Sequence, residues 1–256
     1  MDDSSQKFVA YYAQESLSDR TRDRFLTIRD KAIGLARAGA LDVLDIGCGA
    51  GTQALLWAEL GHRVRGIDIS AELVDIARKR SQQAGFTIAF DVGTATELAL
   101  DAGTIDVCLL PELLEHVPDW ESCLREAIRV LRPGGVLYLS TTNAFCPKQQ
   151  EFGLPLYSWY PRFLKRRFER LAVTTWPGLV QHASYPAVNW FTPYELSRFL
   201  AARGLQCKDR FDMIDVRRLS GVKRMLVELV RSSRAMRFLG HVCTPGTLLF
   251  AVKTPA

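Results

Sequence analysis

Short apolar runs alternate with amphipathic stretches along most of the chain. Apolar runs that predict strands occur at residues 41–46, 63–67, 86–91, 105–110 and 135–141. Apolar residues spaced three and four apart predict helices at residues 53–60, 71–84 and 120–131. Strands that alternate with helices indicate βαβ units and an open α/β fold with a mostly parallel sheet. A ligand of such a sheet is expected beyond the carboxyl ends of the strands.

The two ends of the chain depart from this alternation. Residues 1–40 have helical spacing and predict an N-terminal helical cap, whereas residues 143–191 are rich in aromatic, proline and basic residues and indicate an insertion over the ligand edge. Thr192, Pro193 and Glu195 form a helix start, because a threonine can cap the helix and a glutamate three residues later completes a capping box. A strand (205–211), a basic helical insertion (216–240) and a last strand (247–252) complete the C-terminal part, 192–256.

Composition favours one domain over residues 1–256, with residues 41–142 as the cofactor-binding core. The 256 residues are 48% hydrophobic, which suffices for one α/β core with additions. The net charge of +5 is only mildly basic. The six cysteines form no CxxC pair and have no histidine at zinc spacing, so we expect reduced thiols. The acidic N-terminus and the lack of a long apolar run lead us to expect a cytoplasmic protein.

The strongest local signal is a glycine turn after the strand at residues 41–46. Gly47, Gly49 and Gly51 allow positive φ and remove the Cβ atoms that would keep a ligand away from the backbone. Thr52 can open the next helix. The amides of this turn, that of Cys48 included, are therefore expected to face a ligand.

The spacing and charge of the turn distinguish two classes of ligand. A dinucleotide fingerprint is GxGxxG, but here its third glycine position is Thr52. Asp45 lies in the strand just before the turn, where a carboxylate would repel a pyrophosphate but suits an ammonium group. Asp68, about 20 residues further at the end of the next strand, can accept hydrogen bonds from two ribose hydroxyls. S-adenosylmethionine has an ammonium group, a ribose and no phosphate.

Four motifs in this order resemble those of the class I S-adenosylmethionine-dependent methyltransferases. They are Leu44-Asp45-Ile46-Gly47-Cys48-Gly49-Ala50-Gly51, Gly66-Ile67-Asp68-Ile69-Ser70, Glu112-Leu113-Leu114-Glu115-His116-Val117 and Leu131-Arg132-Pro133-Gly134-Gly135. The pattern is most similar to that of the ubiquinone-biosynthesis O-methyltransferase group. The resemblance implies a Rossmann-like, doubly wound sheet of seven strands whose last strand is antiparallel, with S-adenosylmethionine as the cofactor.

The resemblance also implies roles for single residues. Asp45 and Gly47 would contact the amino-acid end of the cofactor, Asp68 the ribose and Ile69 the adenine, while Pro111 would line the methionine side. Thr94 stands where many relatives have an aspartate that contacts the adenine amino group. Its hydroxyl is a weaker acceptor than a carboxylate.

Methyl transfer to a hydroxyl needs alignment of the acceptor and removal of a proton. His116 is the first candidate base, and Glu112 lies close to it in the sequence. In the relatives the corresponding acids and histidine hold a magnesium ion, so the alternative is a metal site formed by Glu112, Glu115 and His116. A magnesium cofactor is the less favoured expectation, because a buried histidine held by a backbone bond explains the motif as well. His182, in the insertion, is a further candidate base.

Aromatic residues of the insertion are candidates for an acceptor pocket. Aromatic rings with polar edges suit a flat organic acceptor, and the favoured substrate residues are Tyr157, Tyr160 and Trp190. The alternative is that these rings pack the insertion onto the sheet.

Two basic runs suggest a surface for anionic partners. One lies at residues 162–170, and the other, at residues 217–237, is interleaved with apolar residues at helical period. The second pattern fits peripheral contact with an anionic membrane. The alternative is a charged, solvated face over a buried apolar stripe.

We therefore expect a methyltransferase that acts on a small organic acceptor, with a hydroxyl oxygen as the favoured target. No nucleic acid partner is expected, because the sequence holds no RNA-binding module and no Asn-Pro-Pro-Tyr motif after the fourth strand. An RNA or protein methyltransferase and a catalytically silent, cofactor-binding regulatory subunit stay as alternatives. The identity of the acceptor and the oligomeric state do not follow from the sequence.

Overall fold

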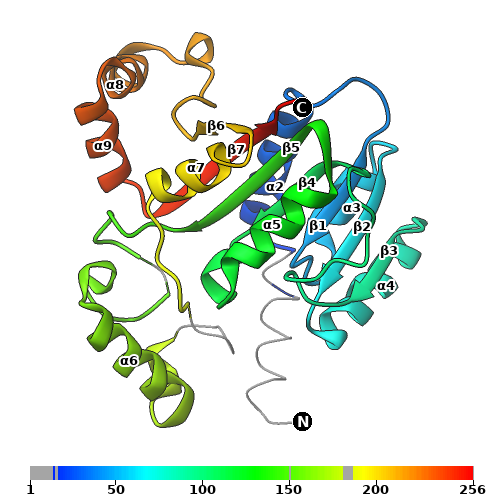
Figure 1. The fold of residues 1–256 in the computed structure, drawn as a ribbon, viewed down its shortest axis with the longest axis horizontal. Helices are drawn as coiled ribbons and strands as arrows, with labels where there is room; N and C mark the ends of the chain where they lie inside the picture. Colours follow the sequence, from blue (N-terminus) through cyan, green and yellow to red (C-terminus); the bar gives the residue numbers. More distant parts are fainter. Residues whose placement is uncertain (1–13, 15–16, 150, 181–186, 256) are drawn as a thin grey trace.

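One mixed sheet of seven strands organises the described part of the chain, which in this computed structural model comprises residues 14, 17–149, 151–180 and 187–255. The strand order is β3-β2-β1-β4-β5-β7-β6 (Figure 1). The strands are β1 (Asp42–Ile46), β2 (Arg63–Asp68), β3 (Ala89–Val92), β4 (Ile105–Pro111), β5 (Leu131–Thr142), β6 (Leu205–Asp209) and β7 (Gly246–Lys253). Neighbouring strands from β3 to β5 pair in parallel, while β7 runs antiparallel to both β5 and β6. The predicted Rossmann-like sheet with an antiparallel last strand is confirmed.

The described part of the chain has eight helices, five of which pack on the two faces of this sheet. They are α2 (Asp19–Ile33), α3 (Thr52–Ala58), α4 (Ala71–Gln83), α5 (Trp120–Val130), α6 (Arg162–Thr174), α7 (Pro193–Ala201), α8 (Gly221–Ser232) and α9 (Arg234–Val242). Short 3₁₀ turns are η1 (Leu114–His116), η2 (Tyr157–Trp159), η3 (Pro177–Leu179) and η4 (Val216–Arg218). Of the N-terminal helical cap, α2 is described, and residues 1–13 lie outside the described residues.

Two apolar cores result from the alternation of side chains along the buried strands. Val43 of β1 and Leu109 of β4 belong to a core shared with α2, α3 and α4. Leu44 and Leu110 belong to the core on the other face, shared with α5 and α7. In Figure 1, α5 and α7 lie in front of the sheet and α2 lies behind it. The glycine turn therefore begins from a strand that is covered on both faces.

The insertion after β5 has a core of its own. Phe152, Tyr157 and Ala172 are buried together, and the partly buried rings of Tyr160, Phe168 and Trp190 pack around them. The insertion includes α6, whereas α8 and α9 follow β6, and both units lie at the side of the molecule away from β3 (Figure 1). Among the described residues, no helix is long and apolar enough to cross a bilayer.

Candidate active site

The glycine turn leaves the end of β1 with the backbone geometry that the sequence predicts. Gly47, Gly49 and Gly51 have φ values of 74°, 52° and 79°, in the left-handed region that favours glycine. A Cβ atom on Gly51 would lie 2.8 Å from the Cβ of Ala77, so this glycine lets α3 and α4 approach each other. A Cβ atom on Gly49 would have nothing within 4 Å. The turn is therefore packed against α4 at Gly51 and open at Gly49, as a site for a ligand requires.

Asp45 is a buried carboxylate that has no partner in the described part of the chain. Its side chain precedes the turn, and neither carboxylate oxygen has a hydrogen-bond partner among the described residues. Burial, with a smaller contribution from the charge of Asp68, raises the pKa of Asp45 to about 7. A buried carboxylate without a partner costs free energy. This cost is relieved by a ligand that brings a cationic or hydrogen-bond-donating group to Asp45.

Asp68 is held in place at the end of β2 by the same turn. The Gly49 amide donates to its Oδ2 at 2.8 Å, and the Ser70 amide donates to its Oδ1 at 2.9 Å. Burial raises the pKa of Asp68, and these amides oppose that shift. Each oxygen keeps a further lone pair for a ligand hydroxyl. The structure thus brings together Asp45, Asp68 and the turn, as the sequence predicts.

The remaining residues predicted to contact the cofactor border this site. The Ile69 side chain, next to Asp68, is 69% exposed and is therefore accessible to a ligand. Thr94 is exposed after β3, and the amide of the preceding Gly93 donates to the Asp68 carbonyl oxygen at 3.0 Å. Cys48 is buried, with its side chain near Gly66, so only its backbone can face a ligand.

Glu112 follows Pro111 at the end of β4 in a conformation that non-glycine residues rarely adopt. Its φ is 48°, and its amide donates to the Ser140 carbonyl oxygen at 2.9 Å. Left-handed backbone at a non-glycine residue costs about 1–3 kcal/mol and clusters at functional sites. Glu112 lines a cavity of about 330 Å³, and the side chain of the next residue, Leu113, packs against Gly47. Glu112, in the cavity wall, is thus one residue from a contact with the glycine turn.

Glu115 and His116 do not join Glu112 in a metal site. Glu115 is fully buried, accepts a hydrogen bond from Thr141 Oγ1 at 2.6 Å, and has a pKa raised well above its usual value by burial and by the nearby charges of Glu112 and Glu151. His116 is half-buried on η1. Within residues 17–149, 151–180 and 187–255, no three His, Cys, Asp or Glu side chains are arranged to hold a metal ion. The predicted alternative of a magnesium site is therefore not supported by this geometry.

The aromatic residues predicted to contact the acceptor lie in the core of the insertion. Tyr157 is fully buried, stacks on Phe152 with ring centroids 4.1 Å apart, and donates to the Lys165 carbonyl oxygen. Tyr157 therefore packs within the insertion itself rather than onto the sheet. Tyr160 and Trp190 pack beside it, and neither lines the cavity next to Glu112. His182, the further candidate base, lies outside the described residues.

The cavity contains residues that the sequence analysis missed. Its lining includes Arg24 and Thr27 of α2, Tyr138 and Ser140 of β5, and Arg210 after β6. Arg210 was hidden in a strand predicted to extend to residue 211, whereas β6 ends at Asp209. The signal that could have found it is a charged residue at a strand end on the ligand edge.

Comparisons with known proteins place this arrangement among methyltransferases. Residues 44–139 match the family model described as a methyltransferase domain. The chain is 43% identical over 181 residues to a ubiquinone biosynthesis O-methyltransferase of Xanthomonas axonopodis pv. citri (strain 306), covering 70% of this chain and 68% of that protein.

Solved structures share the fold. A SAM-dependent methyltransferase from Aquifex aeolicus superposes with a TM-score of 0.56 at 14% identity, covering 98% of this chain and 99% of that one. A geranyl diphosphate C-methyltransferase from Streptomyces coelicolor A3(2), solved with Mg²⁺, geranyl diphosphate and S-adenosyl-L-homocysteine, has a TM-score of 0.57 at 17% identity, covering 91% and 78%.

Proposed function

Because the chain belongs to the class I S-adenosylmethionine-dependent methyltransferases, we propose that it methylates a hydroxyl oxygen of a small organic acceptor bound in the cavity beside Glu112. The observation that carries the proposal is the position of Glu112, a carboxylate in the cavity wall one residue from the contact between Leu113 and the glycine turn. The volume of about 330 Å³ suits an acceptor the size of one ring rather than a segment of RNA or protein.

The residues at and around the glycine turn fit the cofactor. The unpartnered carboxylate of Asp45 would bind its amino group, and the backbone of Gly47, Cys48, Gly49 and Gly51 would surround its amino-acid end. Asp68 would accept from the ribose hydroxyls. Ile69 and Thr94 would border the adenine, and Pro111 the methionine side. When bound, the cofactor supplies an electrophilic methyl group on a sulfonium.

In the proposed reaction the cavity would hold the acceptor hydroxyl toward the methyl group of the cofactor. Glu112 would accept the hydroxyl proton as the methyl group passes from the sulfonium to the acceptor oxygen. Positioning supplies much of the rate, because a near-attack geometry removes most of the entropic cost of bringing the reactants together. The strained backbone at Glu112 would fix the direction of its carboxylate. His116, on η1 but outside the cavity lining, is the alternative base.

Paired substitutions test this assignment. Glu112→Gln should lower kcat by about 10²- to 10⁴-fold, the usual contribution of a general base, without weakening cofactor binding. His116→Gln should change kcat by less than about tenfold. The measurements are methyl transfer to a panel of catechols and binding of S-adenosylhomocysteine by calorimetry. Full activity of Glu112→Gln, with the loss appearing in His116→Gln, would overturn the role of Glu112.

The insertion would contribute by supporting the residues that directly follow Glu112. The Glu115 carbonyl oxygen accepts from the amides of Val188 and Asn189, and Asn189 Nδ2 donates to the carbonyl oxygens of Leu114 and Val117. These bonds tie the end of the insertion to the turn that follows Glu112. We propose that residues 143–191 order the acceptor side of the site in this way, with Tyr160 and Trp190 as supporting residues.

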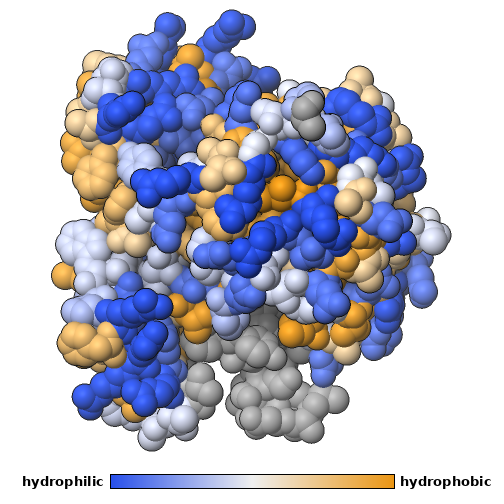
Figure 2. Space-filling view, in the orientation of Figure 1, coloured by the Kyte–Doolittle hydropathy of each residue, from blue (hydrophilic) through white to orange (hydrophobic). Residues whose placement is uncertain are grey.

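The exposed apolar residues of α8 support the proposal that the chain contacts an anionic membrane peripherally. Four apolar residues spaced along one face are 44–65% exposed, and they are Val222, Met225, Leu226 and Leu229. Val230, at the border of this face and four residues after Leu226, lies against Gly240 of α9. The exposure of these four side chains argues against the alternative, in which the apolar stripe is buried beneath a charged face. Figure 2 shows hydrophobic side chains among hydrophilic ones over α8 and α9.

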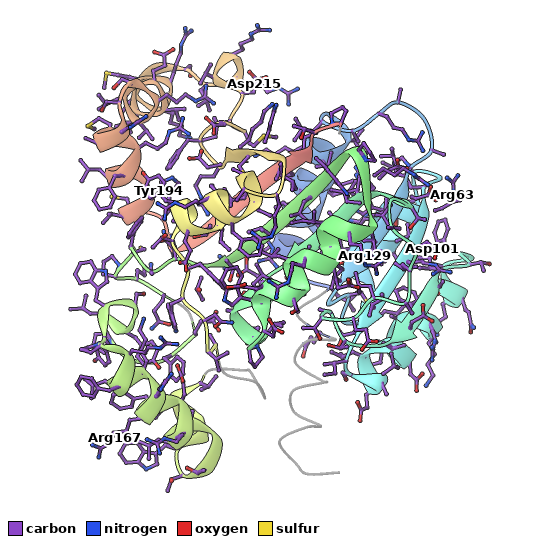
Figure 3. The ribbon with its side chains drawn as sticks, in the orientation of Figure 1. Arg63, Asp101, Arg129, Arg167, Tyr194 and Asp215 are labelled. Atoms are coloured by element: carbon purple, nitrogen blue, oxygen red, sulfur yellow. The ribbon has the colours of Figure 1, made fainter. Side chains whose placement is uncertain are left out.

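Not every basic residue of the two runs is available to such a surface. Arg231 donates to the carbonyl oxygens of Phe211 and Ile214, and Arg237 pairs with Asp209 and Asp212. Lys165 is buried against the Trp190 ring. Exposed cations include Lys223 and Arg234 near α8 and Arg167 on α6, whose side chain points away from the sheet in Figure 3.

Vesicle flotation tests the membrane proposal. The chain should float with vesicles of phosphatidylglycerol and phosphatidylcholine at low salt and not with phosphatidylcholine alone. Leu226→Glu should reduce flotation by at least about tenfold, because it places a charge in the apolar stripe. The matched control Leu60→Glu changes a leucine that is equally exposed, 50% against 51%, at the end of α3. Equal flotation of both variants would refute the role of α8.

A further inference from the structure

Arg210 is a cation that the fold positions at the cavity without a close ion pair to any described acid. It follows β6 directly, and its Nη2 donates to the Gly246 carbonyl oxygen at 2.5 Å. Its Nε has no hydrogen-bond partner among the described residues, and no described carboxylate oxygen lies within 4.0 Å of it. Burial lowers the pKa of Arg210. A partly buried guanidinium without an acidic partner is costly, so its retention at a cavity wall points to an anion.

The acids near Arg210 favour its charged form but are not in ion-pair contact with it. Glu112 and Asp209 both act to raise its pKa, against the larger effect of burial, and Asp209 pairs with Arg237 instead. Two acids, Glu112 and Asp23, belong to the lining, and both side chains are exposed. Arg24, on the wall formed by α2, lies 4.0 Å from Glu112, and because both side chains are about half exposed this ion pair is weak. Arg210 raises the positive potential enough to contribute to a lowered pKa of Lys31 on α2, after the larger effect of burial. Of the two arginines in the lining, Arg210 is therefore the more buried one, and it has no close acidic partner among the described residues.

The rest of the lining suits a ring that carries both a hydroxyl and a charged group. Tyr138, Ile28 and Leu248 supply apolar walls, while Ser140 and Thr247 supply hydroxyls. Glu112 and Arg210 come from different elements, the end of β4 and the end of β6, and both border the same volume of about 330 Å³. A planar guanidinium recognises carboxylates with two parallel N–H···O bonds, which gives both orientation and affinity.

We propose that the methyl acceptor carries a carboxylate that binds Arg210 while its hydroxyl faces Glu112. This inference rests on the proposed function, since it names a chemical feature of the acceptor for the same site. Arg210 is then a specificity-determining residue that orients the acceptor, with no part in the proton transfer. Removal of the carboxylate from the acceptor should raise KM more than it lowers kcat.

The test compares matched ligands by binding rather than by turnover. The chain with S-adenosylhomocysteine is titrated with 3,4-dihydroxybenzoate, 3,4-dihydroxybenzamide, benzoate and inorganic phosphate, and the Arg Nε–H signals are followed by ¹H–¹⁵N NMR. Arg210→Lys assigns the Arg210 signal, and Arg198→Lys, at an exposed arginine on α7, is the control. We expect a saturable shift of the Arg210 signal with the two benzoates and at least tenfold weaker binding of the amide.

Each other outcome overturns the proposal. Equal affinity for the acid and the amide, or no shift of the Arg210 signal with any of the carboxylates, means that Arg210 serves only to fix β7. A shift with phosphate and not with the benzoates would replace the carboxylate by a phosphate group. Failure of the proposed O-methylation is recognised separately, because Glu112→Gln should lower kcat by about 10²- to 10⁴-fold and yet keep the Arg210 shift with benzoate, which has no hydroxyl. Arg24→Met, which leaves Arg210 in place, should keep the preference for the acid over the amide.

Discussion

Replacement of Asp45 by asparagine should make the cofactor-free protein more stable and the cofactor complex weaker. In the unfolded chain an aspartate titrates near pH 4, whereas in the folded chain burial raises the pKa of Asp45 to about 7. The folded state therefore binds more protons between these values, so stability falls as pH rises through this window. At 1.36 kcal/mol per pKa unit, the shift from 3.8 to about 7 corresponds to a cost of about 4 kcal/mol that is complete above pH 7.

Asparagine keeps the shape of the side chain without this cost. In urea unfolding without cofactor, Asp45→Asn should be more stable than the parent chain by up to about 4 kcal/mol at pH 8, and the difference should fade toward pH 4. The same variant should bind S-adenosylhomocysteine roughly 10- to 100-fold more weakly at pH 8, because a hydrogen bond to a charged partner is worth about 1.5–3 kcal/mol.

The control is Asp101→Asn, which changes an exposed acid in the loop before β4 (Figure 3) and should alter neither property. If Asp45→Asn destabilises the cofactor-free chain at every pH, the carboxylate has a partner in the free protein and the argument from its missing hydrogen bonds is wrong. Unchanged cofactor affinity would show that Asp45 does not contact the amino group.

Substitutions at the opposite end of the sheet and in the glycine turn test two further parts of the structure. Asp106→Asn should lower the free energy of unfolding by about 1–2 kcal/mol at pH 7, because Arg37 and other partners outweigh burial and hold the pKa of Asp106 at about 2. Acid unfolding should show this loss vanish as pH falls from 4 to 2. A loss that stays constant over this range would contradict the ion pair. Gly51→Ala should destabilise by about 2–4 kcal/mol, since its Cβ would meet Ala77 at 2.8 Å in a left-handed backbone. Gly49→Ala should lower the stability measured by thermal unfolding by only about 1–2 kcal/mol, because a Cβ atom at Gly49 meets open space, and it should weaken cofactor binding instead. Equal losses of stability in Gly51→Ala and Gly49→Ala would refute this difference between the two glycines.

The parts of the fold that local chemistry determines could be predicted from the sequence. The helix cap predicted at Thr192 is present, with the Thr192 side chain accepting from the Glu195 amide at 3.1 Å. The strands and the glycine turn follow from β-branched runs and from glycine spacing, which reflect contacts close in the sequence. Asp45 and Asp68 lie near each other because the parallel strands β1 and β2 end at the same edge of the sheet.

The acceptor side could not be predicted in the same way, because it depends on contacts between distant segments. Tyr157 has the composition of a pocket residue, yet its ring fills the core of the insertion, and no local pattern separates the two outcomes. Arg210 reaches the cavity only through the pairing of β6 with β7. The positive φ of Glu112 has no signal in the residue type, since glutamate rarely adopts it.

The position of β7 has a consequence for the order in which the chain folds. β6 pairs only with β7 in this sheet, and β7 separates it from β5, although β7 follows β6 by 36 residues, from Asp209 to Gly246. During synthesis, β5 therefore presents an unpaired edge until β7 emerges, while β6 and the helices after it have no sheet to join. Folding of this half must wait for the last strand, so we expect ribosome-bound chains that lack β7 to be the aggregation-prone and chaperone-dependent species.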